Sequence, residues 1–220
     1  MKKYDYLLFD LDGTLTESGP GIMNAAKICL EHLGKIENDE SMLKLFVGPP
    51  LDKSLMERYG YSKEQAWEGI RVFRSYYDKQ GIFENSLYPG ISDMLKQLKA
   101  DGRKTAIASS KPQKQVHRVL EHFNIKQYFD VVVGCELDGT RSTKDEVIEE
   151  VLRQFNLSKS EYMLNVLMIG DRSYDVLGAA KFGIPCIGVA YGYGTKEELF
   201  NAGAIDIADT VKDLKDLLTN

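Results

Sequence analysis

Short apolar runs that alternate with helical patterns fill the chain from residue 85 to its C-terminus, and one more such run opens it. These runs lie at residues 7–9, 105–108, 131–133, 166–169 and 185–190, with an edge strand expected at 205–208. Each has the length and composition of a buried strand. Apolar strands that are separated by helices form a parallel sheet with helices on both of its faces. The sequence therefore predicts an α/β protein with a doubly wound parallel sheet.

Residues 16–84 carry a different pattern, in which apolar residues recur at helical spacing. Ser62, with Gln65 three residues later, predicts a capping box at the start of the longest of these helices. No strand pattern interrupts this part of the chain. We therefore predict an α/β core domain at residues 1–15 and 85–220, and a small all-helical domain at residues 16–84 inserted between its two parts.

The composition is that of an ordinary soluble globular protein, with 43% hydrophobic and 28% charged residues. A formal net charge of −5 shows no basic excess, which disfavours a nucleic-acid partner. The first apolar run is too short for a signal peptide, and no stretch approaches the length of a membrane span. Cys29, Cys135 and Cys186 are widely spaced and are interpreted as buried apolar residues, not as a disulfide or metal site. We therefore expect a cytoplasmic protein; its oligomeric state is left open.

Polar side chains follow the predicted strands at the points where the strands end. They are Asp10 and Asp12, then Ser109, then Lys144 after a loop, then Asp171 and Asp175. The carboxyl ends of parallel strands meet at one edge of a sheet, where the binding crevice lies at the topological switch point. Any one of these residues could be a turn former or a helix cap, but that interpretation explains four coincidences poorly. The sequence therefore predicts a functional site at this edge.

These residue types favour one kind of chemistry. Four carboxylates at one site would repel one another strongly without a cation, and oxygen-only ligands favour Mg²⁺. Ser109 is expected just before a helix whose first N–H groups could hold an anion. Lys144, at the first turn of another helix, adds a positive charge. Together these groups are the parts needed for phosphoryl transfer.

The same residues carry a family resemblance. Asp10-Leu11-Asp12-Gly13-Thr14, Ser109, Lys144 and Gly170-Asp171-x-x-x-Asp175 resemble, in order, the four motifs of the haloacid dehalogenase superfamily. The helical insert resembles the cap domain of its phosphoglycolate-phosphatase-like subfamily, and the correspondence covers essentially the whole chain. The resemblance implies a Mg²⁺-dependent phosphatase that acts on a small phosphorylated metabolite under a cap that excludes water.

The resemblance also implies a role for each residue of the site. Asp10 would be the nucleophile that forms an aspartyl-phosphate, and Asp12 would protonate the leaving oxygen and then activate water. Ser109 would bind the transferred phosphoryl group, with Ser110 beside it as a substrate contact. Lys144 would hold both the phosphoryl group and the Asp10 carboxylate. Dehalogenases of the superfamily lack the second aspartate, so Asp12 points to phosphate esters.

By the same resemblance, the Mg²⁺ ion would be held by four acidic residues. Asp10 and Asp171 would bind it through their carboxylates and Asp12 through its backbone carbonyl. Asp175 would lie near the ion, directly or through water.

Three alternatives stay open. The loop from Gly48 to Lys53 resembles the family's specificity loop, so Gly48 and Lys53 are candidate substrate contacts. Lys53 could equally be a solvated lysine at the start of a helix. It could also be the lysine that forms a Schiff base in a phosphonoacetaldehyde hydrolase. A phosphomutase of the β-phosphoglucomutase type uses the same four motifs. A phospho-accepting receiver domain also gathers carboxylates around Mg²⁺, but it is shorter and has no helical insert.

The substrate itself is not indicated. Arg172 and the run Tyr191-Gly192-Tyr193-Gly194 resemble a bacterial subgroup labelled either phosphoglycolate phosphatases or 5′-nucleotidases. The sequence does not choose between these substrates.

Overall fold

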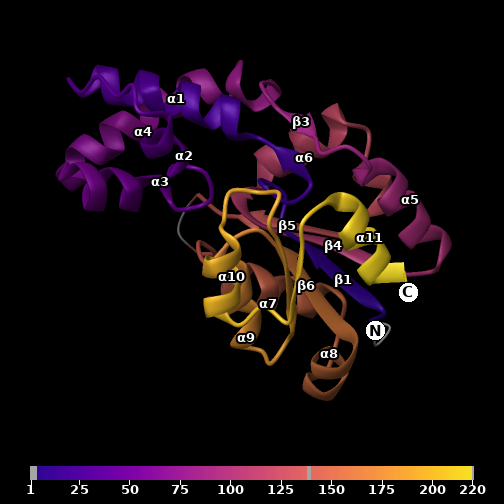
Figure 1. Ribbon diagram of the computed structural model, residues 1–220. Coiled ribbons are helices and arrows are strands. Elements are labelled where there is room, and N and C mark those ends of the chain that lie inside the picture. Colours follow the sequence, from indigo (N-terminus) through magenta and orange to yellow (C-terminus); the bar gives the residue numbers. More distant parts are fainter. Residues whose placement is uncertain (1–3, 138–139, 220) are drawn as a thin grey trace. The chain divides into compact units, whose positions relative to one another are not determined.

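A computed structural model describes residues 4–137 and 140–219 (Figure 1). The chain divides into two compact units. The α/β unit comprises Met1–Thr16 and Leu87–Asn220, and the helical unit comprises Glu17–Ser86. Within the described residues, none of the helices combines the length and apolar character that crossing a membrane requires.

The α/β unit is built on a six-stranded sheet in which every pair is parallel. The strands, in spatial order, are β5 (Val131–Cys135), β4 (Lys104–Pro112), β1 (Tyr6–Phe9), β6 (Val166–Gly170), β7 (Cys186–Val189) and β8 (Asp206–Ala208). The chain runs outward from β1 to β4 and β5, then returns to β6 on the other side of β1. The strand order therefore reverses at β1, and the predicted doubly wound parallel sheet is confirmed.

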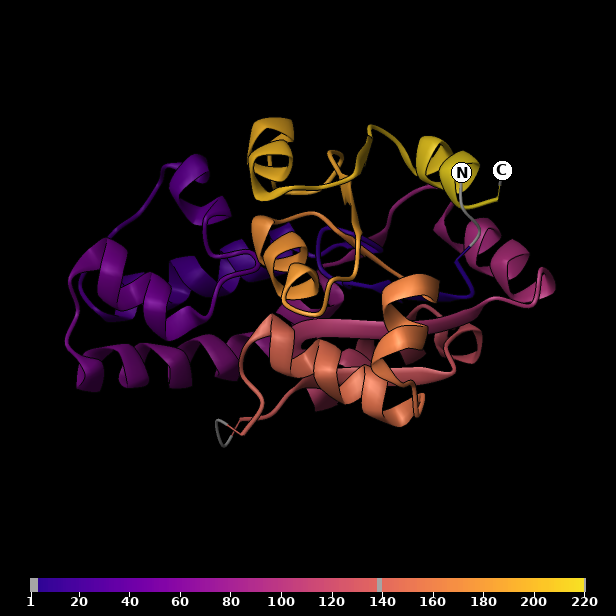
Figure 2. The same cartoon turned by 90° about the horizontal axis from the view of Figure 1, so that it is seen from below.

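Helices pack on both faces of this sheet (Figures 1 and 2). They are α5 (Ile91–Ala100), α6 (Gln113–His122), α7 (Lys144–Gln154), α8 (Lys159–Asn165), α9 (Ser173–Ala180), α10 (Lys196–Ala202) and α11 (Val211–Thr219), with a 3₁₀ turn at Lys126–Tyr128. On one face, Leu8 and Met168 are buried in a core with Val147 of α7 and Val176 of α9. Side chains alternate along a strand, so Phe9 points to the opposite face, where its ring meets Phe129 edge-on.

Strand β4 is longer than the sequence indicates. It continues to Pro112, with a register shift against β5 between Ala108 and Pro112, and α6 begins only at Gln113. Ser109 therefore lies within β4, four residues before the first residue of α6, and not next to the N–H groups of that helix. Pro112 contributes to the extension, because it disfavours a helical conformation for Lys111.

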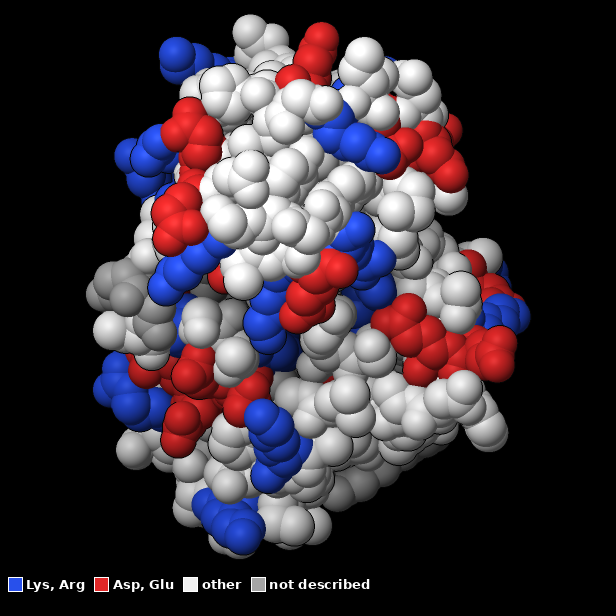
Figure 3. Space-filling view, turned by 90° about the vertical axis from the view of Figure 1, so that its left-hand side faces the viewer, with Lys and Arg blue, Asp and Glu red and all other residues white. Residues whose placement is uncertain are grey.

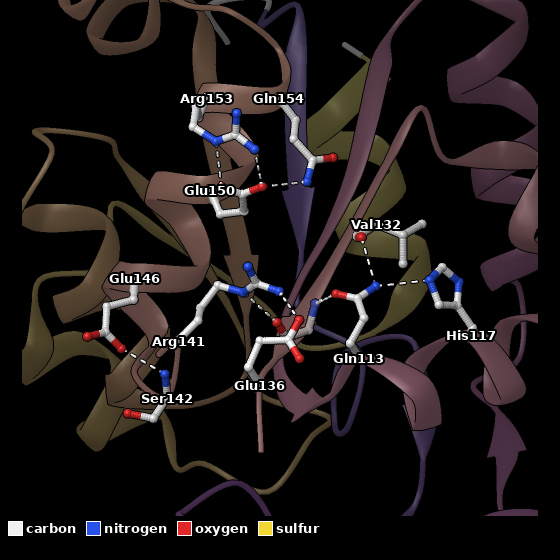
Figure 4. Close-up of polar contacts among 11 residues, drawn as sticks. Gln113, His117, Val132, Glu136, Arg141, Ser142, Glu146, Glu150, Arg153 and Gln154 are labelled. Carbon is white, nitrogen blue, oxygen red and sulfur yellow. Dashed lines mark hydrogen bonds and ion pairs between the residues drawn. The ribbon is translucent and has the colours of Figure 1, made fainter. Parts of the chain in front are cut away.

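The outer edge of β5 is covered by side chains (Figure 4). The Gln113 amide accepts a hydrogen bond from Gly134 N at 2.7 Å and donates one to Val132 O at 3.1 Å. Arg141 Nε donates to Gly134 O at 2.9 Å, and the same guanidinium pairs with Glu136 at 2.7 Å. These contacts satisfy backbone groups that an edge strand would otherwise expose. They also join Glu136 to Arg141, which lie on the two sides of the link from β5 to α7.

The helical unit contains α-helices, a 3₁₀ turn and a π-helical turn. They are α1 (Gly19–His32), α2 (Glu40–Lys44), α3 (Leu51–Lys53), α4 (Lys63–Tyr77) and a 3₁₀ turn at Gly81–Phe83, with a π-helical turn (Ser54–Arg58) between α3 and α4. The capping box is confirmed, because Ser62 Oγ accepts from Gln65 N at 3.3 Å and Gln65 Oε1 accepts from Ser62 N at 2.9 Å. Gly69 of α4 faces Cys29 and Leu33, and a side chain there would collide with both.

The expectation of a purely helical segment at residues 16–84 is corrected at its start. Thr16–Glu17 forms a short strand, β2, that pairs with β3 (Ser86–Leu87). These are the two places where the chain passes from one unit to the other. A two-residue strand is too short to produce an alternating pattern, which is why the sequence does not reveal it.

Figure 3 shows acidic and basic side chains interspersed over the face in view.

Candidate active site

Asp10 lies directly after β1, at the point where the strand order reverses. Its N–H donates to Ile169 O of the neighbouring strand at 2.9 Å, and its own Oδ1 accepts from Leu11 N at 2.7 Å. The residue is 8% exposed. Burial raises the pKa of the Asp10 carboxyl to about 6; nearby carboxylates add to the rise, and the charge of Lys144 opposes it. The backbone of Asp10 is therefore held by the neighbouring strand, and the raised pKa of its carboxyl reflects its burial.

Two further carboxylates come from the residue that follows β6 and from the first turn of α9. Asp171 and Asp175 are completely buried, and together with Asp10 they offer oxygens that lie within 4.8 Å of one another. Gly170 makes this possible, because a Cβ at that position would lie 2.2 Å from Asp175 Cγ. Burial, followed by the charges of Asp175 and Asp10, raises the pKa of Asp171 well above its usual value. Three carboxylates that are this close together and this well buried repel one another.

Lys144 partly offsets that charge. Its Nζ lies 3.0 Å from Asp10 Oδ2 and 2.7 Å from Asp175 Oδ1, and it donates to Ala108 O at 2.9 Å. Burial alone would lower the pKa of this ammonium, but the two carboxylates raise it above its usual value, so Lys144 stays charged.

The start of α7 is what positions Lys144. Thr143 and Glu146 form the predicted capping box around the first turn of this helix. Glu146 Oε2 accepts from Thr143 N at 2.9 Å and from Ser142 N at 2.7 Å; Figure 4 shows the second of these bonds. The buried lysine therefore stands on a helix end whose backbone is fixed by its own side chains.

Asp12 has a partner that the sequence did not indicate. Lys111 Nζ lies 3.1 Å from Asp12 Oδ1 and 2.9 Å from Oδ2, and the Lys111 side chain is only 3% exposed. Lys111 comes two residues after Ser109 at the end of β4. The only signal in the sequence is that a lysine follows the two serines there. The pair is a buried ion pair, which is strongly unfavourable to break by removing one partner.

The two serines of β4 lie at the same end of the sheet. Phe9 pairs with Ile107, so Ser109 stands two positions beyond that pair, next to Ala108, whose carbonyl accepts from Lys144. Ser109 is buried and its Oγ accepts from Lys111 N at 3.3 Å, whereas Ser110 is half-buried.

The structure thus brings Asp10, Asp171, Asp175 and Lys144 into direct contact and places Asp12 and Ser109 on adjacent strand ends. Gly48 and Lys53 belong to the helical unit, where both are exposed, and their role in substrate binding stays a prediction.

The donor set fits a hard divalent cation. Asp10, Asp171 and Asp175 offer oxygen atoms only, and the adjacent Lys144 balances one of their three charges. Such oxygen-only sites are typical of Mg²⁺. The raised pKa values of Asp10 and Asp171 indicate that the protein alone does not compensate this charge.

Comparison with known proteins agrees with this geometry. The haloacid dehalogenase-like hydrolase family matches residues 7–189. A 5′-nucleotidase from Pseudomonas aeruginosa is 39% identical over 197 residues, covering 90% of this chain and 87% of that protein. A tyrosine-protein kinase, PtkA, from Mycobacterium tuberculosis is 35% identical, covering 96% and 72%. The crystal structure of a predicted phosphatase from Clostridium acetobutylicum superposes with a TM-score of 0.93 at 44% identity, covering 99% of each chain.

A parallel sheet that reverses at β1, with buried carboxylates at its carboxyl edge, defines a phosphoryl-transfer type of α/β enzyme. The chain belongs to the haloacid dehalogenase-like hydrolase family. Both the predicted family and the predicted enzyme class, a phosphatase of this family, are confirmed.

Proposed function

We propose that this phosphatase hydrolyses a small phosphate monoester with Mg²⁺, through an aspartyl-phosphate intermediate on Asp10. The observation that carries the proposal is the buried cluster of Asp10, Asp171 and Asp175, whose oxygens lie within 4.8 Å of one another beside Lys144. A purely structural cluster of this kind would be costly, because each buried carboxylate lacks a full set of compensating charges. The cost is understandable if the cluster binds a cation.

The residues of the site supply a balanced two-step reaction. In the first step an oxygen of the Asp10 carboxylate attacks phosphorus, the bond from phosphorus to the leaving oxygen breaks, and Asp12 gives that oxygen a proton. In the second step water attacks the aspartyl-phosphate and gives a proton to Asp12. The bond between phosphorus and Asp10 then breaks, which restores the carboxylate and releases phosphate.

The electrostatics of Asp10 suit a nucleophile. A carboxyl group with a pKa of about 6 is mostly ionised at neutral pH, and Lys144 favours the ionised form. A Mg²⁺ ion held by Asp10, Asp171 and the carbonyl of Asp12, with Asp175 beside it, would supply positive charge against the phosphate oxygens. Ser109 and Lys144 would bind the same phosphoryl group from the strand β4 and helix α7 sides.

The substrate class rests on similarity. The relative from Pseudomonas aeruginosa is a 5′-nucleotidase, and the sequence itself resembles phosphoglycolate phosphatases. We therefore propose a small phosphorylated metabolite, either a nucleoside monophosphate or a phosphorylated small acid or sugar.

A phosphate-release screen with Mg²⁺ tests this function. It would cover phosphoglycolate, nucleoside monophosphates, sugar phosphates and pyrophosphate, using wild type and Asp10→Asn. Wild type should release phosphate from at least one class, and Asp10→Asn should release none. Asp130→Asn, which changes an aspartate on the loop before β5, is the matched control and should keep activity.

Other outcomes of the screen would identify a different function. Turnover of Asp10→Asn near the wild-type rate would refute the aspartyl-phosphate mechanism. Isomerisation of a sugar phosphate with little phosphate release would identify a phosphomutase instead. Transfer of phosphate from ATP to a protein, the activity in the name of the mycobacterial relative, would identify a kinase.

A further inference from the structure

The loop Tyr191–Gly194, which follows β7, packs against two parts of the proposed metal site. Tyr193 N donates to Asp171 Oδ2 at 2.9 Å. The Tyr191 hydroxyl donates to Thr14 O at 3.0 Å, and Thr14 Oγ1 in turn lies 3.4 Å from Asp171 Oδ1. The loop therefore holds one oxygen of Asp171 directly, and it holds the backbone of Thr14, whose hydroxyl lies beside the other oxygen.

The two glycines of the loop are explained by close approach. A Cβ on Gly192 would lie 2.3 Å from Gly13 O and 2.4 Å from Asp171 Cβ. A Cβ on Gly194 would lie 2.0 Å from Asp171 O. Neither glycine is among those with a left-handed backbone, so φ does not require glycine at either position. Glycine is required at both positions because the loop passes so close to Gly13 and Asp171.

The loop is itself anchored. The Tyr191 ring packs edge-on against Tyr88, with 4.9 Å between the ring centroids, and Tyr191 is mostly buried, which raises the pKa of its hydroxyl. A rigid loop that donates a backbone N–H to a carboxylate limits how that carboxylate can rotate. Residues that orient a metal ligand in this way typically influence metal affinity by about 10–100-fold.

We propose that the loop Tyr191–Gly194 is a positioning element that sets the divalent-cation affinity of the site by fixing Asp171. The inference rests on the proposed Mg²⁺-dependent function, because it assigns Asp171 as a metal ligand. The loop residues touch neither the substrate nor the reacting atoms in this proposal. They act only through Asp171 and the turn at Gly13.

Titration of the intact protein with Mn²⁺ alone, followed by electron paramagnetic resonance, tests this proposal. Gly192→Ala should weaken Mn²⁺ binding about tenfold or more. Tyr191→Phe, which removes one hydrogen bond, should weaken it about twofold to tenfold. Gly188→Ala is the matched control, because its Cβ would press on Leu199 at 2.9 Å without touching Asp171. It should lose thermal stability but bind Mn²⁺ as wild type does.

A second readout separates positioning from general damage. At saturating Mg²⁺ both loop variants should hydrolyse p-nitrophenyl phosphate with a KM within about twofold of wild type, while the Mg²⁺ concentration for half-maximal activity rises with the loss of Mn²⁺ affinity. Wild-type Mn²⁺ affinity in Tyr191→Phe and in Gly192→Ala would overturn the inference, and if Gly192→Ala does not fold, Tyr191→Phe decides alone.

The proposed function and this inference can fail separately. A wild-type protein that binds Mn²⁺ but cleaves no phosphate ester would refute the proposed function, while the affinities of the variants would still decide the role of the loop. A wild-type protein that cleaves phosphate esters without binding Mn²⁺ would overturn the role of the loop.

Discussion

Replacing Asp171 by asparagine should stabilise the metal-free protein at alkaline pH. The carboxyl group is completely buried and its pKa is raised well above the usual value, first by burial and then by the charges of Asp175 and Asp10. A raised pKa means that the folded protein binds this proton more tightly than the unfolded chain does. The folded state therefore loses stability as pH rises from the unfolded pKa through the folded one. The neutral amide of the Asp171→Asn variant would carry no such penalty and could still accept from Tyr193 N.

The magnitude follows from the separations in the site. The carboxylate oxygens of the cluster lie within 4.8 Å of one another, and two unit charges at that limit interact by ~3.5 kcal/mol at an effective dielectric constant of 20. The hydrogen bonds that Asp171 accepts weaken by ~1 kcal/mol when the acceptor is neutral. The net gain is then ~1–3 kcal/mol at pH 8, which corresponds to a rise in Tm of roughly 2–10 °C for a chain of this size. At pH 5 the difference should shrink, because the raised pKa values of Asp10 and Asp171 favour their neutral forms as the pH falls.

Thermal unfolding in EDTA at pH 5 and pH 8 measures this effect. In separate scans without EDTA, Mg²⁺ at a hundredfold excess over Kd should stabilise wild type by ~2.7 kcal/mol. It should stabilise Asp171→Asn far less. Asp130→Asn is the matched control of opposite sign. Partial burial of Asp130 raises its pKa, but hydrogen bonds from Thr105 N and Lys104 outweigh burial and hold this pKa below its usual value. Loss of the Asp130 carboxylate should therefore destabilise the protein at pH 8. An Asp171→Asn protein that melts at or below wild type at pH 8 would refute the electrostatic reasoning.

Three further outcomes are expected. Asp12→Ala should keep Mn²⁺ binding but lower kcat about 10²–10⁴-fold. The loss should be larger for alkyl phosphates than for p-nitrophenyl phosphate, because only a poor leaving group needs the proton. Equal losses on both substrates would contradict the role of Asp12 as the acid. Lys111→Met should show the same dependence on the leaving group in steady-state kinetics, since Asp12 loses its ion-pair partner, with partial rescue in Lys111→Arg; a uniform loss would indicate a general packing role. Inorganic phosphate should raise the Tm of wild type only when Mg²⁺ is present, and stabilisation in EDTA would argue against a cation-dependent anion site.

Topology explains why so much of the site could be predicted from sequence. Asp10 and Asp171 each follow an apolar run, and the parallel arrangement of β1 and β6 brings their carboxyl ends together whatever the exact register. Lys144 could be placed because Thr143 and Glu146 form a capping box that marks the first turn of α7. A strand end and a helix start are local signals, and the fold rule converts them into contacts between residues that are far apart in the sequence.

The features that escaped prediction depend on long-range geometry or carry only a short local pattern. The ion pair of Asp12 and Lys111 depends on how far β4 extends past its bulge, which no local pattern gives. Helix α8 has no fully buried residue, and its one sequence signal is the capping box of Ser158 and Glu161 at its start. Helix α11 is different, because Val211, Leu214 and Leu218 do have helical spacing and the sequence contained the signal.

The charge of the site ties these observations together. From sequence, four carboxylates faced one lysine, which leaves an excess of three negative charges. With every carboxyl counted as ionised, Lys111 lowers the formal excess to two, because its ion pair with Asp12 adds a second buried cation, and two is the charge that one divalent ion neutralises. A phosphate dianion meets a repulsive field until such an ion is bound. Afterwards it meets a balanced site, in which neutral donors such as Ser109 can bind it without a further positive charge. If the site binds Mg²⁺ as proposed, we expect the metal to bind before phosphate, and Lys111 reduces the negative charge that the metal has to offset.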